Sequence, residues 1–136
     1  MNLLETSKRL AELVEDEARR MNVPVTISVV DIHGNIILKQ RMTGAPLISI
    51  EMSERKAYTS ASLHMRTAEI TPLVQPGQPL YTITSVAGGR YVALGGGVPL
   101  SAGEEFVAGV GVSGGTTEQD VMIVEAAFRR ALVDIC

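Results

Sequence analysis

The sequence has one cysteine and two histidines among 136 residues, and both scarcities exclude common kinds of site. Cys136 stands at the C-terminal end, so an intramolecular disulfide is impossible and a structural zinc site would lack ligands. We expect a free thiol there. His33 and His64 are too few for a zinc or non-haem iron triad within one chain. No Ser/His/Asp, Cys/His, His-x-x-x-His or Glu-x-x-His arrangement stands out, so the sequence indicates no catalytic residue.

Long apolar runs and basic runs are also missing. No stretch is long enough to span a membrane, and the N-terminus has neither a basic region nor a cleavage site of a signal peptide. The net charge of −3 lacks the basic footprint of a nucleic-acid binder. These features predict a cytoplasmic protein whose partner is a small molecule or another protein, with no nucleic acid and no membrane.

The residues that are present favour one globular domain over 1–136, because 46% are apolar and 20% are charged. Hydrophobic periodicity and turn residues predict the order α-β-β-α-β-β-β-α. We expect an α+β fold with an antiparallel sheet of about five strands and helices packed on one face. In the first hairpin, odd- and even-numbered strand residues, which point to opposite faces of the sheet, are both apolar. This favours a second subunit that covers the face without helices. The expected helices cover 3–21, 49–65 and 118–135, and the expected strands cover 25–31, 36–42, 81–86, 90–94 and 105–113.

Two glycine-rich stretches and one lysine are candidates for a ligand pocket. Gly95, Gly96 and Gly97 offer backbone amides to a ligand, although a glycine-rich strand end with a bulge is the alternative. The stretch Ser113, Gly114, Gly115 and Thr116 leads into a helix N-terminus that could attract an anion. A tight turn with Thr117 as the cap and Asp120 in capping-box position explains most of the same residues. Lys56 is either an anion clamp or an exposed helical lysine with acidic neighbours.

His33 is expected at the tip of a hairpin whose turn is His33-Gly34. Asn or Asp before Gly34 would suit a type I′ turn better, so the histidine needs another reason. An exposed imidazole is an available axial ligand for haem iron, and two copies from related subunits could share one haem. His64 is the alternative ligand, although a half-buried residue at a helix end is the commoner role for such a histidine.

Three segments together resemble the GlcG/HbpS family: "VPVTISVVDIHGNIILKQRMTGAPLISIEMSERKAYTSA", "GGGVPL" and "VAGVGVSGGTTEQD". Within that family, "ASLHMRTAEITPLVQPGQPLY" most resembles the C-terminal domain of the propanediol-utilisation protein PduO. One departure is Thr43, where the family commonly has aspartate. The resemblance places these residues on family motif positions: Asp31, Gly34, Arg41, Lys56, Thr59, Gly95, Gly96, Gly97, Pro99, Gly114, Gly115 and Asp120.

The resemblance implies haem (haem b) as the cofactor and dimers that assemble further, an octamer being one such assembly. We therefore expect a non-catalytic accessory domain for cobalamin-dependent 1,2-propanediol utilisation, with His33 as the iron ligand and a bacterial microcompartment as a candidate location. Corrinoid adenosyltransferase activity would belong to a separate N-terminal domain. Two alternatives remain, an oligomeric scaffold without ligand and a pocket for a carboxylate or phosphate metabolite. That pocket would be lined by Lys56, Thr59, Gly95, Gly96, Gly97, Ser113, Gly114, Gly115, Thr116 and Asp120.

Overall fold

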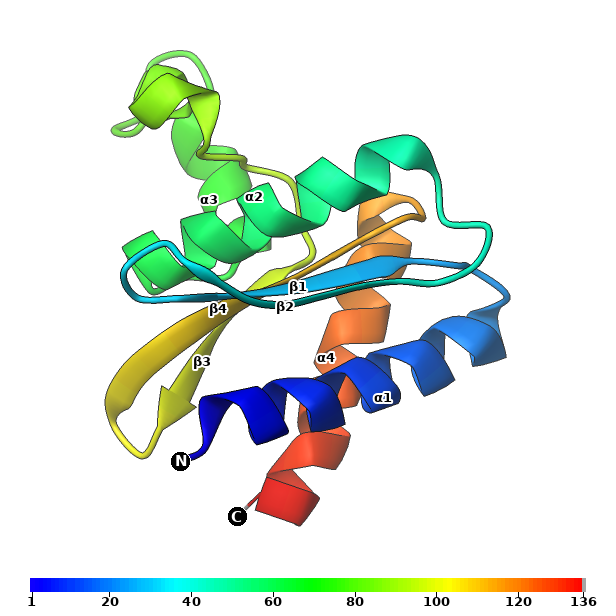
Figure 1. Cartoon of the computed structure of the whole chain (residues 1–136). Coiled ribbons are helices and arrows are strands. Elements are labelled where there is room, and N and C mark those ends of the chain that lie inside the picture. The colour runs from blue at the N-terminus through cyan, green and yellow to red at the C-terminus, as the bar shows by residue number, and fades with distance from the viewer. Residues whose placement is uncertain (136) are drawn as a thin grey trace.

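The computed structural model describes residues 1–135 and shows a four-stranded antiparallel sheet between two helical layers (Figure 1). The strand order is β2-β1-β4-β3, and Cys136, where we expect a free thiol, lies outside the described residues. The α+β class is confirmed, while the count of about five strands was one too high. The elements are α1 Leu3–Met21, β1 Thr26–Asp31, β2 Ile36–Arg41, α2 Leu47–Leu63, α3 Thr67–Ile70, the 3-10 turns η1 Thr71–Val74, η2 Ile83–Ser85 and η3 Ala87–Gly89, then β3 Gly97–Ala102, β4 Glu105–Ser113 and α4 Thr117–Ile135.

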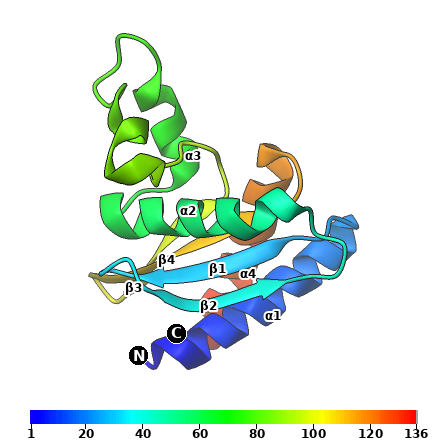
Figure 2. The same ribbon diagram turned by 45° about the horizontal axis from the view of Figure 1, so that its top comes forward.

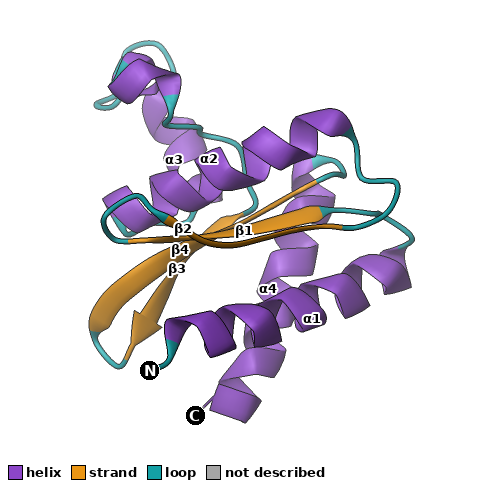
Figure 3. Cartoon of the chain, in the orientation of Figure 1, coloured by secondary structure: helices purple, strands orange, loops and turns teal. Residues whose placement is uncertain are grey.

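One face of the sheet is covered by α1 and α4, which pack against each other beneath it (Figure 3). The Asn2 side chain accepts a hydrogen bond from Glu5 N at the start of α1, and Asn22 ends the helix in the left-handed conformation. The apolar stripes of both helices meet the odd-numbered residues of β1 and the even-numbered residues of β4. The buried core comprises Leu10, Ala11, Leu13, Val14, Ala18, Val25, Ile27, Val29, Val98, Leu100, Ala108, Val110, Val112, Ile123, Val124, Ala127 and Ala131.

The opposite face of the sheet is covered by α2 of the same chain, so the prediction that all helices lie on one face was wrong. Hydroxyl pairs join this helix to β1, with Thr26 Oγ1 and Ser49 Oγ 2.8 Å apart and Ser28 Oγ and Ser53 Oγ also 2.8 Å apart. Gly109 of β4 meets the α2 backbone, where a Cβ would collide with the Ala57 carbonyl oxygen. Small and hydroxyl side chains thus let the helix lie very close to the sheet, and this face needs no second subunit to cover it.

Residues 71–96 form a lobe that stands above α2 instead of adding strands (Figure 2). Strands were predicted over 81–86 and 90–94, but these segments form 3-10 turns and irregular chain. Positive φ angles at Ala87, Gly88 and Gly89 interrupt any extended run there. The lobe is tied to α2 by side chains, as Val92 N donates to Thr59 Oγ1 at 2.9 Å.

The β1–β2 hairpin is confirmed, but its turn differs from the predicted two-residue turn at His33-Gly34. The strands are joined through four residues, 32–35, and Gly34 N donates to Asp31 O at 3.0 Å. Gly34 has a φ of 85°, whereas His33 is not among the residues with positive φ. The turn therefore holds His33 without strain, and no Asn is required at this position.

No helix within residues 1–135 combines the length and the apolar character needed to cross a membrane.

We expect Gly109→Ala to destabilise the fold by about 3 kcal/mol, because the added methyl group overlaps the backbone of α2. The backbone angle at Gly109 lies outside the positive-φ region, so relief of chain entropy alone would make this change stabilising. Urea unfolding monitored by circular dichroism measures the difference. Glu105→Ala, at an exposed position of the same strand, is the control. Equal unfolding free energies for the two variants would show that the helix is not held against this glycine.

Candidate functional site

Both histidines line one cavity of about 230 Å³, formed between the β1–β2 turn and the C-terminal end of α2. Figure 1 shows these two segments side by side. His33 and His64 are 31 positions apart in the sequence, and both side chains are exposed. The remaining lining residues are Asp31, Ile32, Gly34, Tyr58, Ala61 and Ser62.

His33 is positioned by the carboxylate of Asp31. Asp31 Oδ1 accepts hydrogen bonds from His33 N at 2.9 Å and from Asn35 N at 3.0 Å, which fixes the backbone on both sides of Gly34. The His33 imidazole itself makes no hydrogen bond to any described residue. The imidazole is thus exposed and unpaired among the described residues, on a turn whose backbone is fixed.

His64 is held more tightly than His33. It ends α2 with a φ of 58°, and its N–H donates to Ser60 O at 2.9 Å. Its ring stacks on Phe106, with centroids 4.2 Å apart and planes 14° apart. Phe106 and Tyr58 were not singled out from the sequence, because a lone aromatic residue carries no spacing signal that would place it beside a particular histidine.

Lys56 and Asp120 form a buried ion pair on the other side of α2. Lys56 Nζ donates to Asp120 Oδ2 at 3.0 Å and to Val112 O at 2.9 Å, and the two side chains are only 2% and 3% exposed. A Cβ on Gly96 would lie 2.9 Å from Nζ, so a residue with a side chain at position 96 would crowd the amine. The sequence analysis placed Lys56 and Asp120 in the same expected ligand pocket, and the structure shows them as partners in an ion pair.

Burial dominates the protonation of this pair. Desolvation lowers the pKa of Lys56 and raises the pKa of Asp120, while their mutual attraction and the Gly115 and Gly114 amides act in the opposite direction. Burial therefore opposes the charged form of each group, and the ion pair offsets part of that opposition.

The cap of α4 differs from the predicted one, which used Thr117 and Asp120. Thr116 Oγ1 accepts from Gln119 N at 3.1 Å and Gln119 Oε1 accepts from Thr116 N at 2.9 Å, so the capping box is formed one position earlier. Asp120 is thereby free to accept from Gly115 N at 2.9 Å through Oδ1. The Asp120 carboxylate thus accepts the hydrogen bond of the Gly115 amide, which was expected to bind an anionic ligand.

The other residues of the expected anion pocket are engaged in different ways. Thr59 Oγ1 donates to Arg55 O at 2.8 Å, and Gly97 N donates to Thr67 Oγ1 at 2.8 Å. Ser113 is buried at the end of β4, in register with Thr26. Their role in ligand binding stays a prediction.

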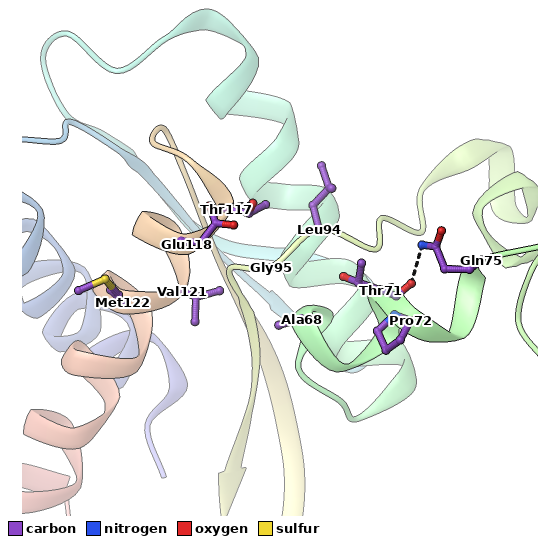
Figure 4. A pocket seen from close by; sticks show the side chains of 10 residues that line it. All are labelled: Ala68, Thr71, Pro72, Gln75, Leu94, Gly95, Thr117, Glu118, Val121 and Met122. Atoms are coloured by element: carbon purple, nitrogen blue, oxygen red, sulfur yellow. Dashed lines mark hydrogen bonds between the residues drawn. The ribbon is translucent and has the colours of Figure 1, made fainter. Parts of the chain in front are cut away.

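Gly95 lines a larger cavity of about 770 Å³, between the lobe and the first turns of α4. Figure 4 shows apolar side chains of Leu94, Val121 and Met122 around it and Glu118 at the start of the helix. A carboxylate at this position disfavours an anionic ligand. Neither histidine lines this cavity.

The model of the haem-degrading HbpS-like family matches residues 3–129. The chain belongs to this family. It is 45% identical over 125 residues to an uncharacterized 15.0 kDa protein from the dhaT-dhaS intergenic region of Citrobacter freundii, covering 92% of this chain and 88% of that protein. The expected relation to the GlcG/HbpS family and PduO is confirmed.

Two further relatives connect the fold with PduO. The corrinoid adenosyltransferase PduO of Salmonella typhimurium is 37% identical over 120 residues, which cover 88% of this chain but only 36% of PduO. The crystal structure of a PduOC:haem complex superposes with a TM-score of 0.88 at 35% identity, covering 92% of this chain and 91% of that one.

We expect Lys56→Met and Asp120→Asn each to destabilise the protein by about 3 kcal/mol, because each leaves a buried charge without its counter-charge. The double variant should lose at least about 1 kcal/mol less than the sum of the two, since no lone charge remains. Chemical denaturation of all four proteins gives this coupling. The partly exposed pair Lys39–Glu54, joined at 2.9 Å, is the control, and Lys39→Met with Glu54→Gln should couple by less than about 1 kcal/mol. Additive losses at Lys56 and Asp120 would contradict the pairing.

Proposed function

We propose that this protein binds haem (haem b) at the cavity between the β1–β2 turn and the end of α2, with His33 as the axial ligand of the iron. The observation that carries the proposal is the convergence of both histidines on this one cavity. It is supported by membership of the HbpS-like family and by the similarity to the haem complex of PduOC.

The chemistry of the cavity fits a porphyrin. Neutral imidazole is a common axial ligand of haem iron, and the exposed side chains of Ile32 and Phe106 add apolar surface for a macrocycle. Of these two residues, Ile32 contributes an aliphatic side chain and Phe106 the aromatic ring that stacks on His64. When bound, haem supplies the redox-active iron, and the chain supplies the ligand and the surface.

His33 is the better ligand of the two histidines. Its imidazole has no hydrogen-bond partner among the described residues, and its backbone is fixed by Asp31. The His64 ring is instead packed against Phe106, which fixes its orientation. We therefore assign His64 to the wall of the site.

A second copy of the chain completes the site in this proposal. The cavity of about 230 Å³ lies below the usual 300–1,000 Å³ of sites that enclose a small molecule, so one chain leaves a porphyrin largely exposed. Ile32 and Ile36 are both 48% exposed beside His33 and offer apolar surface to a partner. A symmetric dimer would place two imidazoles on opposite sides of one iron.

The biological setting proposed here is 1,2-propanediol utilisation, as an accessory domain near a corrinoid adenosyltransferase and within a bacterial microcompartment. The similarity to one third of PduO supports this setting. A metabolite pocket around Lys56 has less support, because Asp120 already neutralises that amine and both groups are buried.

Titration with haemin tests the ligand assignment. We expect wild type and His64→Ala to give a saturable ferric complex with a sharp low-spin Soret band, and His33→Ala to lose that band because the iron loses its nitrogen ligand. Free imidazole added to the His33→Ala complex should restore the low-spin spectrum. An unchanged spectrum in His33→Ala would sink the assignment, and loss only in His64→Ala would move the ligand to the end of α2.

Assembly tests the sharing of haem between chains. Light scattering coupled to size-exclusion chromatography should show that haemin shifts wild type to a larger oligomer, whereas His33→Ala should not respond. Native masses that are the same with and without haemin in both proteins would argue against a shared iron.

A further inference from the structure

A second cavity of about 280 Å³ adjoins the histidine cavity, and the two share Gly34 and Tyr58 in their linings. The first cavity offers two imidazoles and the aliphatic side chain of Ile32, while its one carboxylate, Asp31, accepts hydrogen bonds from the backbone of the turn. The second is lined by charged groups, which gives the two halves different chemistry. Its other lining residues are Val30, Glu51, Glu54, Arg55 and Arg90.

Tyr58 forms the wall between the two cavities and is held from several sides. A Cβ on Gly34 would lie 3.2 Å from its Cε2, so the hairpin turn packs on the edge of the ring. The Tyr91 ring lies 5.4 Å from it, centroid to centroid, at an angle of 59°. The Arg90 guanidinium lies 5.4 Å from the ring centroid, within the range of a cation–π contact.

The charges of the second cavity leave Arg90 as its available cation. Glu51 accepts from Arg55 at 2.7 Å, and the Arg55 guanidinium also donates to the Gly89 carbonyl oxygen at 2.8 Å. Glu54 is paired with Lys39 at 2.9 Å. Arg90 is exposed and makes no ion pair with any described residue. Arg55 of the lining and Lys39 from outside it thus neutralise the two carboxylates, and the positive charge without an ion-pair partner is that of Arg90.

Haem has the same division of chemistry, with a coordinating metal at its centre and two propionate carboxylates at one edge. We propose that Arg90 binds a propionate of the haem whose iron His33 ligates, an assignment that rests on the haem function proposed above. Arginine suits this role because its planar guanidinium donates two parallel hydrogen bonds to a carboxylate. The stacking on Tyr58 orients the guanidinium before the ligand arrives, which lowers the entropy lost on binding.

The experiment compares two iron porphyrins that differ only in the carboxylates. Haemin and ferric protoporphyrin IX dimethyl ester are titrated, in one detergent-containing buffer, into wild type, Arg90→Ala and Arg90→Lys. We expect Arg90→Ala to weaken haemin binding by about 5- to 10-fold, and Arg90→Lys to weaken it less, because charge is kept while the bidentate geometry is lost. Wild type and Arg90→Ala should bind the diester within twofold of each other.

The Soret spectrum and a distant arginine serve as controls. The low-spin spectrum should be the same in all three proteins, since iron ligation by His33 is untouched. Arg129→Ala, an exposed position on α4 across the sheet from α2, should bind haemin like wild type. Equal haemin affinity in Arg90→Ala and wild type, an equal loss for the diester, or a changed spectrum overturns the role of Arg90. Absence of saturable haemin binding in wild type overturns the haem function itself.

Discussion

The close approach of α2 to the sheet is the constraint on which the rest of the structure depends. At Gly109 and Gly111 of β4 the helix backbone occupies the space that a side chain would fill. Facing hydroxyls of β1 and α2 hydrogen-bond across the same interface, whereas the buried Ser60 Oγ of α2 has no partner among the described residues. Because the helix lies so low, its far end reaches the β1–β2 turn, where Gly34 packs on Tyr58. The candidate haem cavity is a consequence of this contact.

The same closeness buries Lys56, whose amine has no route to solvent and must find an acceptor inside. Asp120 supplies the counter-charge through Oδ2, while Thr116 and Gln119 cap α4. The pair ties α2, the end of β4 and the start of α4 to one point. Desolvation makes such a pair a poor source of stability, yet a misplaced α4 would leave a lone buried charge, so the pair favours one arrangement over its competitors. Its value lies in specificity of packing.

Local signals in the sequence predicted the elements that depend on short-range chemistry. The periodic stripe and the stop at Asn22 located α1 to the residue, and the alternating strands located the first hairpin. Predictions failed where long-range packing decides the outcome. The lobe was read as strands because "YTITSV" has high β-propensity, but its backbone groups close 3-10 turns, such as the bond from Val86 N to Ile83 O. Farther along the lobe, Val92 N bonds to Thr59 of α2. The covering of the second face by α2 could not be read from serines and glycines, which carry no hydrophobic period. Both histidines of the candidate site were singled out from the sequence, whereas their common cavity, Phe106 and Arg90 required the fold.

The predicted reason for the histidine also needs revision. The hairpin does not use a two-residue turn, so the turn accepts a histidine at position 33 without strain. The turn is fixed by Asp31 and Gly34 alone, and any polar residue could stand at position 33 at no conformational cost. The candidate site thus consists of the exposed His33 imidazole beside the apolar side chain of Ile32, and of the Arg90 guanidinium, which lies over the Tyr58 ring. A ligand that coordinates through a metal and carries carboxylates at its edge uses all of these groups, whereas a simple metabolite anion would use only the last.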